Sequence, residues 1–204
     1  PMETKGMIRK YCTAAFSALT VLGFAGVSEA HTFDAYGTMF GAGFLHPLGG
    51  LDHVLVMLGV GLWAGQMGKD TAWKLPALFV TMTLVGGVAG MIGISLPFAE
   101  AGIALSVLVV GIVIALSWNT DVVTGFGMAG FFAVFHGYAH GAEIPQAVLP
   151  ALYSVGFILA TSILLVTGSG AGSVIRRAGI SGMHWHEAAV GFIATAGVVF
   201  LVSV

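Results

Sequence analysis

Long apolar stretches separated by short polar breaks constrain this chain more than any other feature. They run over residues 38–66, 76–98, 101–118, 122–140, 146–167 and 188–204. Each is close to the ~20 residues that a helix needs to cross the hydrocarbon core of a bilayer. Only 8% of the residues are charged, too few to cover a water-exposed surface. Glycines such as Gly86 and Gly90 indicate close helix packing. The pattern predicts an all-α membrane protein, a compact bundle of six transmembrane helices.

The first 30 residues have the organisation of a secretory signal peptide. Two basic residues precede a short apolar run over 14–27, which ends in the small-x-small sequence Ser28-Glu29-Ala30. We expect cleavage after Ala30, with an uncleaved signal anchor as the alternative. The chain then divides into residues 1–30, an N-terminal extension with the signal peptide, and residues 31–204, a six-span transmembrane transport domain.

The basic residues predict the orientation of the bundle. Cleavage of the signal peptide places the new N-terminus outside, so that the connections between spans alternate between the two sides of the membrane. Every lysine and arginine beyond residue 31 then falls in an inner connection: Lys69, Lys74, Arg176 and Arg177. This distribution follows the positive-inside rule. We therefore expect an N-out, C-out protein of the bacterial cytoplasmic (inner) membrane, with its mature N-terminus in the periplasm.

Two motifs place ionisable side chains inside apolar stretches. They are His46-Pro47-Leu48-Gly49-Gly50-Leu51-Asp52-His53 and Phe135-His136-Gly137-Tyr138-Ala139-His140-Gly141-Ala142-Glu143. A charged residue at the centre of a span costs about 2.5 to 3.5 kcal/mol on insertion scales, so such a group needs a partner, water or a metal ion. One buried histidine alone is readily explained by a bond to a neighbouring helix, but Asp52, His53, His136 and His140 together favour a metal site.

The spacing within the motifs predicts how they meet. His46 and His53 are two helical turns apart and would share one helix face, while Pro47 and the following glycine pair would bend or break the helix. His136 and His140 are four residues apart, which suits two imidazoles on one ion. Both motifs fall in the outer half of the predicted bundle, so we expect them to converge there.

Further candidate ligands lie outside the spans. Glu100 and Glu143 fall in outer connections, and His31 would begin the mature chain, where its amine and imidazole could chelate together. An ordinary loop charge and an ordinary exposed terminus are the alternatives. Whether His184 and His186, at the start of the last stretch, form an exit site is left open.

The donor set favours a metal path over other functions. Cys12 lies in the segment expected to be removed, so the ligands are imidazoles and carboxylates, which suit Ni(II), Co(II), Zn(II) or Mn(II) rather than Cu(I). No glycine-rich segment has the context of a nucleotide site, and 7 basic against 9 acidic residues give no patch for nucleic acid. We therefore expect an importer that uses no ATP.

Two rival functions remain open from the residues alone. An intramembrane zinc-dependent hydrolase would use Asp52, His53, His136 and His140 to hold zinc, although the chain has no HExxH or GxSxG sequence. A membrane protein that stores or senses metal is the other rival. A cytoplasmic metallochaperone and an oligomer are also left open as partners.

The two motifs give the chain a family resemblance. HPLGGLDH and FHGYAHGAE resemble the two signatures of the HupE/UreJ family, in the expected order. The resemblance implies a permease, not an enzyme, that imports nickel to supply hydrogenase or urease; some relatives are associated with cobalt. It implies that Ni(II) or Co(II) is the transported substrate rather than a prosthetic group. Carried over by motif position, the metal-binding residues are His46, Asp52, His53, His136, His140 and Glu143.

Overall fold

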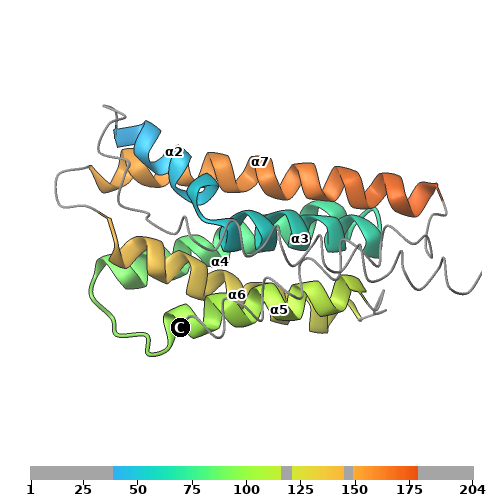
Figure 1. Ribbon diagram of the computed structural model, residues 1–204, viewed down its shortest axis with the longest axis horizontal. Helices are drawn as coiled ribbons and strands as arrows, with labels where there is room; N and C mark the ends of the chain where they lie inside the picture. Colours follow the sequence, from blue (N-terminus) through green and yellow to red (C-terminus); the bar gives the residue numbers. More distant parts are fainter. Residues whose placement is uncertain (1–38, 116–120, 145–148, 179–204) are drawn as a thin grey trace, which may run out of the picture.

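Six helices make up the part of the chain that the structure, a computed structural model, describes: residues 39–115, 121–144 and 149–178. They are α2 (Met39–Gly49), α3 (Leu51–Met67), α4 (Thr71–Met91), α5 (Ala99–Ala115), α6 (Val122–Ala142) and α7 (Pro150–Arg177). The long helices run side by side along one axis (Figure 1). Over the described ranges the fold is all-α, as the sequence predicts.

Three of these helices, α4, α6 and α7, are long and apolar enough to cross a membrane. The bent pair of α2 and α3 passes the same test when taken together, and α5 is a shorter apolar helix of 17 residues. The described part is therefore that of a helical, multi-pass membrane protein. The expected signal peptide at 1–30 and the expected span at 188–204 lie outside the described residues.

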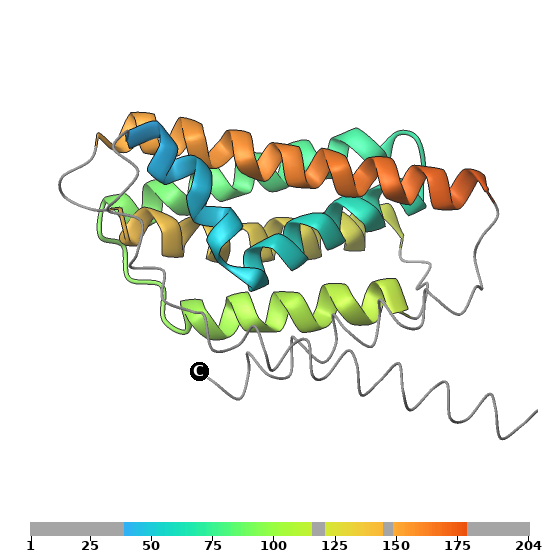
Figure 2. The same ribbon diagram turned by 45° about the horizontal axis from the view of Figure 1, so that its top comes forward.

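A sharp bend between α2 and α3 interrupts the first apolar stretch. The two helix axes differ by 79° at a break of a single residue, Gly50, which has an extended backbone. Pro47 contributes no backbone N–H to α2, and glycine has little preference for continuing a helix. The predicted break is confirmed, and Figure 2 shows α2 crossing α7 while α3 lies along it. His46 and His53 consequently do not share one continuous helix face.

Glycines allow two helix pairs to pack backbone against backbone. In the α4–α6 pair, a Cβ on Gly86 would overlap the carbonyl oxygen of Val134, and one on Gly137 would overlap that of Thr83. In the α3–α7 pair, a Cβ on Gly61 would overlap the carbonyl oxygen of Leu165. The close packing predicted from small residues is confirmed, and it holds α6 in a fixed register against α4.

Helix α7 is longer than the sequence predicts. The Gly/Ser-rich residues 168–173 read as a break after residue 167, but they are helical, and α7 continues to Arg177. Local composition was misleading because these small residues serve packing. A Cβ on Gly172, for example, would overlap the carbonyl oxygen of Leu62 in α3. Near the same end of the bundle, Arg176 Nε donates a hydrogen bond of 3.1 Å to the carbonyl oxygen of Gly65.

A serine in this stretch also completes the hydrogen bonding of α4. Pro76 lies inside α4 and has no N–H to donate to the carbonyl of Ala72, one turn earlier. Ser169 Oγ donates to that carbonyl oxygen at 2.6 Å. A polar backbone group that would be costly in an apolar interior is thus satisfied from the neighbouring helix.

Candidate metal-binding site

Four histidine rings from three helices form a continuous row. The ring centroid of His140 lies 4.6 Å from that of His46 and 4.4 Å from that of His53, and His53 lies 5.0 Å from His136. His46 comes from α2, His53 from the first turn of α3, and the other two from α6. The two motifs therefore converge as expected. The reason is not a shared helix face but the bend, which turns α2 and α3 so that both reach His140.

The ring of His53 is held by the preceding residue. Asp52 Oδ1 accepts hydrogen bonds from both Nδ1 (2.7 Å) and the backbone N–H (2.9 Å) of His53. Because an ionised carboxylate only accepts, Nδ1 carries the hydrogen, and in a neutral imidazole Nε2 then keeps its lone pair. Nε2 is buried and has no hydrogen-bond partner. Carboxylate, imidazole and a free nitrogen in this order are the arrangement of many metal-binding histidines.

The two histidines of α6 are the most deeply buried members of the row. His136 is fully buried and His140 is 4% exposed. His136 Nε2 lies 2.8 Å from Ser106 Oγ in α5, whereas its Nδ1 is buried and has no hydrogen-bond partner. Both ring nitrogens of His140 are also buried and without a partner. Unsatisfied polar atoms of this kind are costly in an apolar interior and favour a ligand that supplies the missing contact.

A second grouping of ligand atoms lies at the end of α6. His46, His140 and Glu143 each offer a donor atom, and these atoms lie within 4.8 Å of one another. Glu143 follows the last residue of α6 and is exposed, and His46 is partly buried. His140 belongs to both groupings, because it also contacts His53. The row thus joins a partly exposed set of ligands, at the end of α6, to the deeper pair formed by His53 and His136.

The remaining predicted residues are less closely placed. Asp52 lies beside His53 and bonds to it, which makes it an orienting group as well as a candidate ligand. Glu100 lies in the first turn of α5, is exposed, and is not among the grouped ligands of the described residues. His31, His184 and His186 fall outside the described residues.

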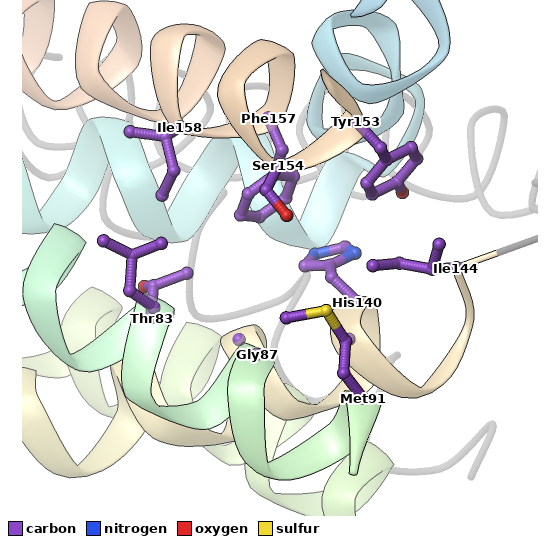
Figure 3. A pocket seen from close by; sticks show the side chains of 12 residues that line it. Thr83, Gly87, Met91, His140, Ile144, Tyr153, Ser154, Phe157 and Ile158 are labelled. Carbon is purple, nitrogen blue, oxygen red and sulfur yellow. The ribbon is translucent and has the colours of Figure 1, made fainter. Parts of the chain in front are cut away.

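A pocket between α4, α6 and α7 reaches the row from the side. It is partly open to the outside and is lined mainly by apolar groups. Figure 3 shows His140 with Tyr153 and Phe157 of α7 on one side and Met91 of α4 on the other. The ring of Tyr153 also lies 5.8 Å from that of His46, so one tyrosine borders both the pocket and the grouping at the end of α6.

Comparisons with known proteins identify the family of this chain. The family model described as HupE / UreJ protein matches residues 19–200. The chain belongs to the HupE/UreJ family. Protein HupE of Rhizobium leguminosarum bv. viciae is 38% identical to it over 187 residues, which cover 91% of this chain and 96% of the relative. No solved structure matches. The family resemblance inferred from the two motifs is thereby confirmed.

In this HupE/UreJ chain, two residues of the site lie outside both motifs and could not be found from them. Ser106 contacts His136 from α5, and Tyr153 borders His46 from α7, yet neither lies within a motif. A signal for Ser106 exists, because it is the only hydroxyl residue in the apolar run 103–115. Tyr153 gives no comparable signal, since a tyrosine near the start of a membrane helix is ordinary.

Proposed function

We propose that this protein is an ATP-independent permease that imports Ni(II) across the cytoplasmic membrane. One observation carries the proposal: a row of four imidazoles inside an apolar bundle, with buried nitrogens of His53, His136 and His140 that have no hydrogen-bond partner. Neutral imidazole with carboxylate is a donor set that suits Ni(II), Co(II) and Zn(II). Nickel is favoured over cobalt by the family resemblance, which links these motifs to the supply of hydrogenase or urease.

The order of the ligands supports passage rather than permanent storage. Glu143 and His46 form the more exposed grouping, where a hydrated ion could first exchange water for protein ligands. His140 contacts both His46 and His53, so an ion can change partners by moving along adjacent rings without leaving imidazole contact. His53 and His136 then provide the buried nitrogens. A closed structural site would instead gather its ligands in one cage.

The positions of the basic residues support the proposed orientation of the bundle. Lys69 lies between α3 and α4, and Arg176 bonds to Gly65 near the end of α3, so these cations share one end of the bundle. The grouping of His46, His140 and Glu143 lies at the end where α6 finishes and α7 begins. The positive-inside rule places the first end in the cytoplasm and the second towards the periplasm. This is the orientation expected of the proposed six-span, N-out protein.

The membrane potential is sufficient to drive such transport. Moving one elementary charge through 100 mV is worth about 2.3 kcal/mol, so a divalent ion gains about 4.6 kcal/mol. At about 1.4 kcal/mol per factor of ten, this would sustain roughly thousandfold accumulation in the cell. ATP hydrolysis is therefore not required.

Uptake of radiolabelled nickel by cells tests the proposal. Cells expressing wild type, Asp52→Ala and His140→Ala at equal membrane levels would be compared. We expect uptake above that of empty cells for wild type only. Asp52→Ala frees the ring of His53, and His140→Ala removes a ligand. Equal uptake by all three proteins would refute the assignment of this site. Purified protein that keeps stoichiometric zinc, cleaves a substrate and shows no flux in liposomes would favour the hydrolase instead.

A further inference from the structure

Ser106 of α5 touches the row of histidines from a helix that carries neither motif. It is fully buried, and its Oγ takes part in two short contacts. One is with the carbonyl oxygen of Ile103 at 2.6 Å, and the other is with His136 Nε2 at 2.8 Å. Both distances are those of good hydrogen bonds.

The number of hydrogens available decides the direction of these two bonds. A serine hydroxyl has one hydrogen, and a carbonyl oxygen cannot donate. The hydrogen of Ser106 is therefore used on the carbonyl of Ile103, and Ser106 Oγ must accept from His136. It follows that Nε2 of His136 carries the ring hydrogen. Its Nδ1, which is buried and has no partner, keeps the lone pair.

We infer that Ser106 is a positioning residue that fixes the tautomer of His136, so that Nδ1 is the nitrogen offered to the transported metal ion. The inference rests on the proposed function of the histidine row. Ser106 then does for His136 what Asp52 does for His53, but with the opposite ring nitrogen. The buried pair presents Nε2 of His53 and Nδ1 of His136, on rings 5.0 Å apart and nearly perpendicular, at 88°.

A neutral partner at this position has a chemical consequence. Asp52 brings a negative charge to His53, whereas Ser106 orients His136 without adding one. Two carboxylates beside the buried pair would hold a divalent cation more strongly, since each adds charge attraction in a medium of low dielectric constant. A hydroxyl orients the ring and leaves the ion free to move on, as transport requires.

The test compares two buried serines that both donate to a carbonyl oxygen. Ser106→Ala removes the acceptor for His136. Ser169→Ala is the matched control, because Ser169 is 7% exposed and bonds to Ala72 at 2.6 Å, with no histidine contact among its hydrogen bonds. Full-length wild type and both variants would be purified in detergent, and equilibrium binding of Ni²⁺ would be measured. Loss of an orienting partner typically weakens metal binding 10- to 100-fold. We therefore expect Ser106→Ala to bind Ni²⁺ about 10- to 100-fold more weakly than wild type, and Ser169→Ala to bind it with near wild-type affinity.

A spectroscopic measurement separates positioning from simple structural support. In metal-free protein with ¹⁵N-labelled histidine, the His136 ring signals, assigned by their absence in His136→Ala, report which nitrogen carries hydrogen. We expect the Nε2–H form in wild type and in Ser169→Ala, and a mixture of forms in Ser106→Ala.

The outcomes distinguish this inference from the proposed function. An Nδ1–H form in wild type, or equal nickel affinity of wild type and Ser106→Ala, would overturn the inference even if the cells import nickel. Wild-type protein that binds no nickel and supports no uptake would refute the proposed function, and the ¹⁵N spectrum would still decide the tautomer.

Discussion

Gly137 offers the sharpest test of how the fold positions the histidines. It lies between His136 and His140, and a Cβ added to it would lie 2.7 Å from the carbonyl carbon of Thr83 in α4. Ordinary contact begins at about 3.4 Å. The obstacle is backbone on a packed helix, which cannot rotate away as a side chain could. The carbonyl oxygen of Thr83 lies nearer still, so Gly137→Ala requires α4 and α6 to separate locally by considerably more than about 0.7 Å.

Two opposing terms set the magnitude. Alanine favours a helix over glycine by about 0.5 to 1 kcal/mol. Overpacking costs about 1 to 3 kcal/mol, and occasionally more. We expect the upper part of that range here, so that Gly137→Ala destabilises the protein by about 1 to 2 kcal/mol net. Metal–ligand distances tolerate only about 0.2 Å, so the same shift should also lower nickel uptake.

Gly127 is the matched control on the same helix, because a Cβ there would meet nothing within 4 Å. Gly127→Ala should keep wild-type uptake and be equal or higher in stability. Thermal unfolding in detergent, followed by tryptophan fluorescence, gives the first measurement, and radiolabelled nickel uptake gives the second. If Gly137→Ala melts and transports like Gly127→Ala, the α4–α6 contact does not position the histidines and the reasoning fails.

Three further predictions follow from single contacts. Ser169→Ala leaves the Ala72 carbonyl without its donor, which should cost about 1 to 3 kcal/mol in the same melting experiment; an unchanged melting temperature would contradict this. Gly50→Ala would place a Cβ 2.7 Å from the Asp52 carboxylate, so nickel uptake should fall while the protein still reaches the membrane; normal uptake would show that the break tolerates a side chain. Hydrogen bonds from Thr124 lower the pKa of the Asp121 carboxyl at the start of α6, so its stabilising effect is present near neutral pH and lost as acid protonates it. Plots of stability against pH for wild type and Asp121→Ala should therefore converge in acid. Parallel plots would show that Asp121 does not cap α6.

The convergence of the two motifs could be predicted from sequence because polar groups in lipid must find partners. The manner of convergence could not. Spacing placed His46 and His53 on one helix face, whereas the structure brings both rings against His140 through a 79° bend at Gly50. Pro47 and the glycine pair predict a break in the helix. The angle between α2 and α3 is set by their packing, because both helices contact α7.

Other features depended on contacts that no local pattern contains. Residues 168–173 read as a connection because glycine and serine usually interrupt helices in water. In this bundle they allow α7 to approach α3, so the helix continues. Ser106 is a related case: a single serine in an apolar run indicates a polar group that needs a partner, but the sequence does not show that the partner is His136.

The break before α3 joins the folding problem to the functional one. A helix that begins inside an apolar bundle exposes backbone N–H groups, which have no water to bond with. Asp52 Oδ1 accepts one of them, the N–H of His53, and the same oxygen also accepts Nδ1–H of the His53 ring. Its negative charge is favoured by the positive end of the helix dipole. A single carboxylate thus stabilises the interrupted helix and leaves Nε2 of His53 free for a metal ion. Both hydrogen bonds end on the same oxygen. A substitution that removes this oxygen should therefore weaken the start of α3 and release the His53 ring at the same time.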